Sequence, residues 1–173
     1  KNIPLNIRNT NAPQDPGTMI RERFDGDSDP HRFITGITGK KDFSIIALTK
    51  RGMSSQVGVL RKVLTVLERH NISVDYVPNG IDNVSVVMPT EAVASSLYTI
   101  LGEIQKEVEP DNMVVYDQIA VVAAVGRKMA FRPGISGQIF ATLGQAGINI
   151  RMINQGTDEL NIIFGVDNRD FDS

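Results

Sequence analysis

Apolar and polar positions alternate along residues 43–77 in a way that predicts a strand, a helix and a second strand. Residues 43–49 (Phe-Ser-Ile-Ile-Ala-Leu-Thr) form a short, mostly apolar run typical of a buried strand. A helix that ends near His70-Asn71 is indicated next, because apolar residues then recur at i, i+3, i+4 and i+7, at Leu60, Val63, Leu64 and Leu67. Residues 72–77 predict the next strand, and Pro78-Asn79-Gly80 a turn.

The pattern continues through residues 84–115 with three more elements. Residues 84–88 predict a strand, and residues 113–115 predict another. Between them we expect one helix that opens at 89–91, with Thr90 as its N-cap. The buried face of this helix is marked by Val93, Leu97, Ile100, Leu101 and Ile104. The order β-α-β-β-α-β predicts an α+β, ferredoxin-like fold, in which both helices cover one face of an antiparallel four-stranded sheet.

The same pattern occurs a second time, displaced by 76 residues (127 − 51 = 76). Residues 51–53 align with 127–129, Gly58 with Gly134, and residues 86–88 with 162–164, all without a gap. A period of this length is too long for a solenoid repeat and suits one small domain. The chain is therefore predicted to hold two copies of one fold, packed side by side.

The second copy is expected to be incomplete in linear sequence. It predicts a strand at 119–125, a helix at 134–146 and strands at 148–153 and 160–166, and then the sequence ends near the start of its second helix, at 166–167. A spare strand at 33–38 precedes the first copy and is expected to complete the second sheet. We divide the chain into 1–32, 33–116 and 117–173; residues 8–31 carry loop chemistry, with a mobile linker predicted at 25–30.

Composition removes several classes of function. The chain has no cysteine and two histidines, His31 and His70, so thiol catalysis and zinc sites built on cysteine or histidine clusters are not expected. A net charge of −2 gives no reason to propose nucleic acid or a membrane surface as a partner. The start lacks both Met and a signal-peptide pattern, so we expect a piece of a longer, cytoplasmic protein.

The loop before the first helix is the candidate ligand site. Gly52 to Gly58 leads into a helix N-terminus, where unpaired backbone N–H groups and the helix dipole favour a carboxylate. Ser54 and Ser55 are candidate N-caps, and Gly58 either lets a ligand approach the backbone or only makes room for packing. Asp75 offers an acceptor for an ammonium group, whereas its counterpart, Arg151, repels one. The first copy is thus the better candidate for binding an amino acid, although Asp75 also suits a solvated strand residue.

The repeated motifs resemble paired ACT domains, and most closely the regulatory half of aspartate kinase. The second-copy motif Ala-Gly-Ile-Asn-Ile-Arg-Met-Ile-Asn-Gln-Gly at 146–156 carries most of this likeness, together with 125–129 and 133–135. Residues 7–11 and 16–18 are similar to the end of the kinase domain. The resemblance implies a parent enzyme that phosphorylates aspartate with ATP and Mg, although no phosphate-binding loop with its Lys stands in this sequence. This chain is therefore expected to need no cofactor, to have no catalytic residue, and to sense lysine, threonine or both.

The resemblance also implies particular site residues and partners. It places the effector site on Met53, Gln56, Leu60, Ser73, Val74, Asp75, Asp82 and Asn83, in addition to Ser54, Ser55 and Gly58 from the loop itself. Asn154 and Gln155 are interface candidates that either face the other copy or satisfy a turn. The expected partners are a second copy of the chain, joined through ACT domains, and the kinase domain of the same parent.

Other functions stay open at this point. Residues 55–61 faintly resemble the loop of acylphosphatases, but Arg61 falls inside the predicted helix. An RNA-binding sheet would need exposed aromatic residues, and the strand at 72–77 offers only Tyr76. An ACT pair attached to a different protein of amino-acid metabolism is the remaining alternative.

Overall fold

The structure, a computed structural model, describes residues 3–20, 34–126, 129, 133–156 and 160–173. The chain forms two compact units, residues 1–33 and residues 34–173. In the first, β1 (Leu5–Ile7) pairs antiparallel with β2 (Thr18–Ile20). The sequence predicted only loop at 8–31; β2 was missed because three residues are too few to show a period. The predicted linker at 25–30 lies outside the described residues.

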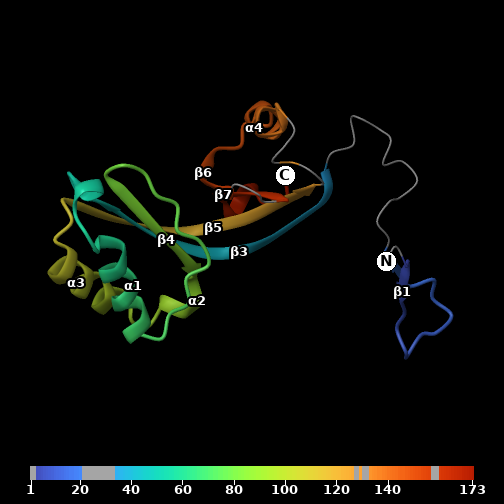
Figure 1. The fold of residues 1–173 in the computed structure, drawn as a ribbon, viewed down its shortest axis with the longest axis horizontal. Coiled ribbons are helices and arrows are strands. Elements are labelled where there is room, and N and C mark those ends of the chain that lie inside the picture. Colours follow the sequence, from blue (N-terminus) through green and yellow to red (C-terminus); the bar gives the residue numbers. More distant parts are fainter. Residues whose placement is uncertain (1–2, 21–33, 127–128, 130–132, 157–159) are drawn as a thin grey trace. The chain divides into compact units, whose positions relative to one another are not determined.

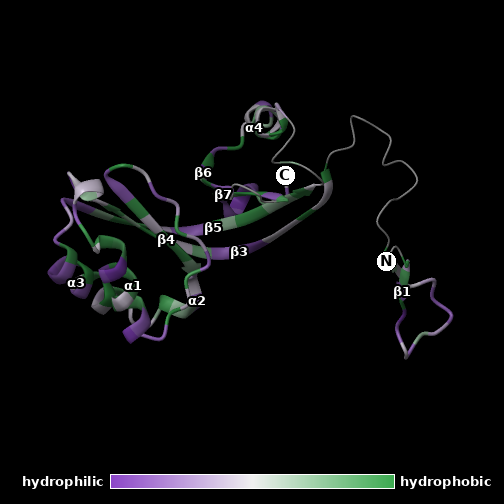
Figure 2. Ribbon diagram, in the orientation of Figure 1, coloured by the Kyte–Doolittle hydropathy of each residue, from purple (hydrophilic) through white to green (hydrophobic). Residues whose placement is uncertain are grey.

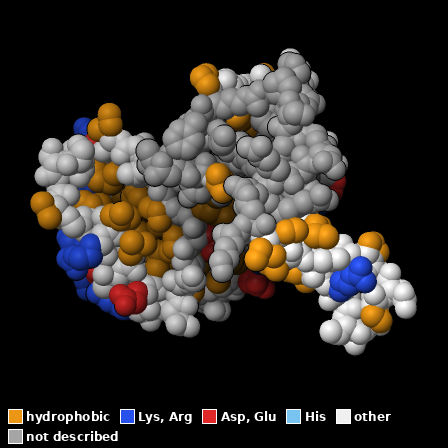
Figure 3. Space-filling view, turned by 45° about the vertical axis from the view of Figure 1, so that its right-hand side comes forward, with side chains coloured by type: hydrophobic (Ala, Val, Ile, Leu, Met, Phe, Trp, Pro, Cys, Tyr) orange, Lys and Arg blue, Asp and Glu red, His pale blue; other side chains and the backbone are white. Residues whose placement is uncertain are grey.

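The β1–β2 ribbon exposes apolar side chains. Figure 3 shows hydrophobic side chains gathered on it, and the exposed ones are Ile3, Leu5, Ile7, Met19 and Ile20. A lone two-stranded ribbon is at best marginally stable in water. The ribbon therefore needs a covering surface to be stable.

The second unit is built on a five-stranded sheet in which every neighbouring pair is antiparallel (Figure 1). The order across the sheet is β4-β3-β5-β7-β6. The strands are β3 (Ile34–Thr49), β4 (Asn83–Pro89), β5 (Asn112–Gly126), β6 (Ile150–Asn154) and β7 (Asn161–Asp167). The predicted α+β class is confirmed.

Two of these strands, β3 and β5, are shared by two lobes. Residues 43–49 of β3 pair with β4 and with residues 112–116 of β5, and we call this part, with its helices, the first lobe. Residues 34–40 of β3 pair with residues 121–126 of β5, which also pair with β7, and we call this part the second lobe. The sequence predicted separate strands at 33–38 and 43–49, and at 113–115 and 119–125, where the structure has two continuous strands. Residues 34–40 lie in the sheet of the second lobe, and that the strand at 33–38 completes a second domain stays a prediction.

The helices of the first lobe are α1 (Val59–Arg69), α2 (Thr90–Val93) and α3 (Leu97–Val108). The sequence predicted one helix where α2 and α3 are separated by residues 94–96. Ser95 and Ser96 favour such an interruption, because serine side chains compete for backbone hydrogen bonds. Thr90 is not an N-cap: its hydroxyl forms a 2.9 Å hydrogen bond with that of Ser44.

The apolar faces of α1 and α3 form the main core against the sheet. Figure 2 shows their hydrophobic residues turned toward the strands and their hydrophilic residues turned away. The core comprises Val63, Val66, Leu67, Ile100 and Ile104 from the helices and Ile46, Leu48, Val84, Val86 and Met88 from β3 and β4. Burying each such side chain contributes about 1.5–3 kcal/mol. The periodicity in the sequence thus identified the face that holds the first lobe together.

The segment 72–77 does not form the strand that the sequence predicted. Within this segment only Tyr76 forms a bridge, an isolated one to Val87. Asn79, in the turn that follows, forms another isolated bridge, to Val84. The backbone N–H groups of Asp75 and Tyr76 both donate to the carbonyl of Val87, so two residues oppose one. This local bulge breaks the alternation that a regular strand requires.

In the second lobe, α4 (Ile135–Gln145) packs beside the strands, with the rings of Phe140 and Phe164 in an edge-to-face contact at 6.3 Å. The predicted helix at 134–146 is confirmed with slightly shorter bounds, and the predicted strand at 148–153 is shifted to 150–154. In place of a second helix near 166–167, the chain makes a 3-10 turn at Asn168–Asp170 (η3).

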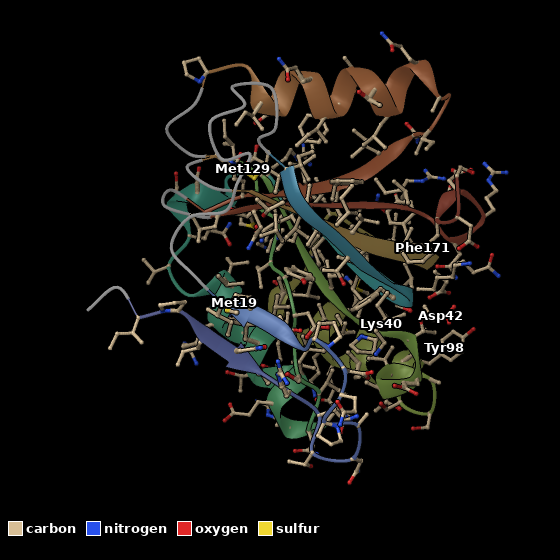
Figure 4. All side chains as sticks on the ribbon, turned by 90° about the vertical axis from the view of Figure 1, so that its right-hand side faces the viewer. Met19, Lys40, Asp42, Tyr98, Met129 and Phe171 are labelled. Atoms are coloured by element: carbon tan, nitrogen blue, oxygen red, sulfur yellow. The ribbon has the colours of Figure 1, made fainter. Side chains whose placement is uncertain are left out.

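Both shared strands bulge where they pass from one lobe to the other. Asp42 has φ +68° and Gln118 has φ +57°, and the strand register shifts beside each of them. Beside this junction, Phe171 lies against β3 at Gly39, where a Cβ would come within 2.6 Å of the ring. Figure 4 shows Asp42 and Phe171 on the same side of β3.

A second apolar cluster, which we call the seam cluster, links the lobes. It contains Phe43, Ile45, Val87, Ile119, Val121 and Met152, with Tyr76 and Ile163 packed against them. Ile45 and Val87 alternate with core residues on their strands, so the seam cluster lies on the sheet face opposite α1 and α3. Desolvation by burial raises the pKa of Tyr76, which agrees with a ring packed into this cluster and not presented for base stacking.

Candidate functional site

The loop between β3 and α1 is held by its first residues and opens onto a helix end. The backbone N–H of Arg51 donates to Oδ2 of Asp111 at 2.7 Å, and that hydrogen bond lowers the pKa of the carboxyl group. Lys50 is fixed in the same way, because its backbone N–H donates to the carbonyl of Asp82 at 2.9 Å. The loop therefore starts from a rigid base.

A short 3-10 turn (η1, Met53–Ser55) follows, and Gly58 then begins α1. Gly58 has φ +84° and occupies the N-cap position without any side-chain cap. Ser54 and Ser55 were predicted as N-caps, and this is wrong because they lie in η1, three and four residues before Gly58. Gly134 has φ +88° at the N-cap of α4, so the two helices begin alike. The first N–H groups of α1 are thus left without a side-chain cap.

A cavity of about 200 Å³ opens between this loop and β4; we call it the loop cavity. It brings together four of the predicted effector residues, Met53, Gln56, Gly58 and Leu60. Gln56 is exposed and Met53 partly buried against the core, so the cavity has one polar and one apolar side. Such a cavity suits a small molecule that carries both kinds of group.

Two residues of the loop cavity were missed by sequence reasoning. Arg61 was given no role beyond its place in the predicted helix, yet it lines the loop cavity, and its Nε lies 3.7 Å from the position of a Cβ on Gly58. It adds positive charge beside the helix N-terminus, where an anion is already favoured. Asn79 comes from the turn before β4, and the Pro-Asn-Gly signal located the turn without showing which cavity it borders.

The structure does not bring the remaining predicted effector residues into this cavity. Ser54 and Ser55 are exposed on η1, and Ser73 and Asp75 are exposed on the irregular segment, with Val74 packed on the core. Asp82 is partly buried in the turn, and Asn83 faces a different cavity. Within one chain, the predicted ammonium acceptor Asp75 is therefore separate from the residues that line the loop cavity.

The equivalent region of the second lobe has different chemistry. Arg151, the counterpart of Asp75, donates from Nε and Nη2 to the two oxygens of Asp167, each at 3.1 Å. That hydrogen bonding raises the pKa of Arg151, so the guanidinium stays charged. Most of the loop at 127–132 lies outside the described residues. Asn154 ends β6 and is partly buried, while Gln155 is exposed; their predicted interface role stays a prediction.

The described residues contain neither a candidate metal site nor a candidate membrane-spanning helix. Its histidine, aspartate and glutamate side chains form no group of three that could hold a metal ion. None of the helices described for residues 3–173 combines the length and apolar character that a membrane crossing needs.

Comparison with known proteins gives a consistent class. A sequence model of the ACT domain matches residues 122–173. Aspartokinase 3 of Bacillus subtilis is 30% identical over 165 residues, which are 95% of this chain and 36% of the relative. The crystal structure of Clostridium acetobutylicum aspartate kinase is 42% identical, with a TM-score of 0.85, and the match covers 98% of this chain and 39% of that one. The regulatory subunit of aspartate kinase from Thermus thermophilus, at 24% identity, matches with a TM-score of 0.67 over 80% of this chain and 90% of its own.

The fold and the loop-to-helix site define an α+β regulatory region that contains an ACT domain. The chain corresponds to the C-terminal regulatory region of the aspartate kinases. It spans about a third of the length of the curated relatives it matches, 36% of the Bacillus protein and 34% of the Saccharomyces cerevisiae aspartokinase.

Proposed function

We propose that this region senses an amino acid, lysine or threonine or both, and transmits its binding as feedback inhibition to a kinase domain in the same parent protein. The parent would phosphorylate the side-chain carboxylate of aspartate with ATP and Mg, in the cytoplasm. The two lobes would be two ACT domains side by side, with domain limits at 33–116 and 117–173.

The observation that carries this proposal is the loop cavity. Gly58 leaves the N-terminus of α1 uncapped by any side chain, and Arg61 stands beside it. These groups favour the carboxylate of an amino acid. Met53 and Leu60 give the cavity an apolar wall for an aliphatic side chain.

A second copy of the chain would complete the site. The α-ammonium group of an amino acid needs an acceptor, and Asp75 is exposed but does not line the loop cavity of its own chain. A homodimer through the first lobes would supply Asp75 from the partner. Escherichia coli aspartokinase III, 24% identical with a TM-score of 0.73 over 98% of this chain, was solved in complex with lysine and aspartate, which makes lysine the first effector to test.

For allostery, the effector must bind one arrangement of the lobes more tightly than another, because equal binding shifts no equilibrium. Calorimetric titration of the chain with lysine, with threonine and with both tests the proposal, and sedimentation velocity with and without effector tests dimer formation. We expect heat with at least one amino acid and a larger sedimentation coefficient in its presence.

The variant Asp75→Asn distinguishes a role of Asp75 as the ammonium acceptor from the alternative that it is only a solvated residue. It should weaken effector binding about tenfold, since a hydrogen bond to a charged group contributes about 1.5–3 kcal/mol. Asp15→Asn, in the other unit of the chain, is the matched control and should change nothing. Absence of heat with either amino acid, alone or together, would overturn the proposal.

A further inference from the structure

A second and larger cavity lies on the opposite sheet face, between the two lobes. Its volume is about 370 Å³, and we call it the seam cavity. From the first lobe, Ile45 and Ala47 of β3 and Ser85 of β4 line it. These residues alternate with Ile46, Leu48 and Val84 of the main core, so the seam cavity lies on the face away from α1 and α3.

The second lobe closes the seam cavity with the start of β6. Asn149, Ile150, Arg151 and Met152 line it from that side. Met152 is 7% exposed and belongs to the seam cluster together with Ile45, so this strand is packed against the first lobe and does not merely pass near it. The cavity therefore exists only where both lobes meet.

The lining divides into an apolar floor and a polar rim. Ile45, Ala47 and Met152 are the floor, and Ile45 is 4% exposed. Tyr116 also lines the cavity, and its side chain is exposed to solvent. The rim carries the amides of Asn79, Asn83 and Asn149 and the hydroxyl of Ser85. A cavity with an apolar floor and a few converging polar groups is the usual form of a small-molecule site.

Among the described residues that line the cavity, Arg151 is the one with a charged side chain, and it is already oriented. Its Nε and Nη2 donate to Asp167, which does not line the cavity. Asp167 is also 3.6 Å from Nη2 of Arg169, so its charge is shared between two guanidinium groups. The Nη1 hydrogens of Arg151 remain for a further acceptor, as far as the described residues show.

From this geometry we infer that the seam cavity binds a small carboxylate with an apolar body, the chemistry shared by apolar amino acids and the matching 2-oxo acids. The carboxylate accepts from Arg151 as a second partner, and the apolar body covers Ala47 and Ile45. Asn79 and Asn149 provide acceptors for an ammonium group if the ligand carries one. The described lining residues include no carboxylate to pair with the cationic end of lysine. This site shares Asn79 with the loop cavity but no other lining residue, and it does not depend on the function proposed for that cavity.

Calorimetric titration of the 173-residue chain with leucine and with 4-methyl-2-oxopentanoate, in separate arms, tests this inference. Heat with leucine alone identifies the amino acid as the ligand form, and heat with the oxo acid alone or with both identifies the carboxylate and the apolar body as sufficient. If neither leucine nor the oxo acid binds with a dissociation constant of about 10 mM or tighter, the inference is overturned.

Two variants test the site from independent sides. Arg151→Gln should weaken binding about tenfold or more, as expected for loss of a charge-assisted hydrogen bond. Arg169→Gln is the matched control: it removes the other arginine beside Asp167 but not a lining group, and should leave binding within about twofold. Ala47→Leu should fill the floor and abolish binding.

The thermal midpoint of each variant without ligand shows whether it is folded. Arg151→Gln alters the second lobe and Ala47→Leu the first, so each tests the site by itself. If only one of the two variants folds, its binding measurement is enough to decide whether the ligand occupies the seam cavity. Binding that survives in a folded variant of either kind places the ligand elsewhere and overturns the inference. Lysine added at saturation should not compete with leucine, which separates the seam cavity from the loop cavity.

Discussion

Asp42 and Asn168 bind each other twice. The backbone N–H of Asp42 donates to Oδ1 of Asn168 at 3.2 Å, and Nδ2 of Asn168 donates to Oδ1 of Asp42 at 2.8 Å. Asp42 is the residue with positive φ at which β3 passes between the lobes. Nearby, Nζ of Lys41 lies 2.6 Å from Asp172 and over the ring of Phe171. Residues 168–172 thus hold in place the bulge of β3 at the junction of the two lobes.

Removing this fastening should destabilise the junction. Asn168→Ala loses both hydrogen bonds and is expected to lower the free energy of unfolding by about 1 kcal/mol in urea denaturation. Asp42→Val should cost about 1–3 kcal/mol more, because a β-branched residue is strained at positive φ. Asp42→Asn keeps the acceptor and tolerates the backbone, so it should be nearly neutral. Equal stabilities for Asn168→Ala and the unaltered chain would show that the pair contributes nothing.

Gly165 should not accept a side chain. A Cβ there would lie 2.6 Å from Cγ of Met152 and 3.2 Å from Cγ2 of Ile119, inside the seam. Gly165→Ala is expected to lower stability by about 1–3 kcal/mol through overpacking. Adding Met152→Ala should recover part of the loss, although it leaves space of its own. Gly137→Ala, on α4 with no atom near its Cβ position, should instead raise stability by up to about 1 kcal/mol, and a loss there would contradict the packing argument.

The hydrogen bond from Arg51 to Asp111, which holds the start of the loop between β3 and α1, should stabilise the fold in a pH-dependent way. The backbone N–H of Arg51 lowers the pKa of Asp111, so the folded state holds the ionised form more tightly than the unfolded state does. The stabilisation is therefore present above the ordinary carboxyl pKa of about 4 and is lost as pH falls through the lowered folded pKa. Asp111→Asn should lower the thermal midpoint at pH 7 and should converge with the unaltered chain in acid. A difference that persists unchanged in acid would assign the effect to packing.

Arg61 should contribute to effector binding at the loop cavity. Arg61→Gln is expected to weaken binding by about two- to fivefold, the range for an exposed charge, measured by calorimetry with the effector identified first. Lys62→Gln is the matched control: it removes the same charge one residue further along α1, where Nζ binds the carbonyl of Glu107 at 3.0 Å. If both variants weaken binding alike, the contribution is general electrostatics and not a local contact.

Local periodicity predicted the elements that bury one regular face. It located α1 and α4 closely by their spaced apolar residues, and β4 and β7 by their short apolar runs. It failed at 72–77, where two N–H groups share one carbonyl, and at Thr90, whose hydroxyl binds Ser44. Both failures come from partners distant in sequence, which no local pattern reveals.

The candidate site was predictable in part for the same reason. Met53, Gln56, Gly58 and Leu60 lie within eight residues of one another and share a cavity. Arg61 and Asn79 were missed because their contribution depends on how α1 and the turn before β4 come together. The gap-free repeat gave the second lobe its topology, but continuous pairing through β3 and β5 could be seen only in the folded chain.

The strands β3 and β5 run without a break through both lobes. Removing residues 43–117 would shorten both strands and take away β4, but it would leave the pairing of residues 34–40 with residues 121–126. Any rotation imposed on one lobe is also carried by two uninterrupted backbones into the other, with no intervening tether to absorb it.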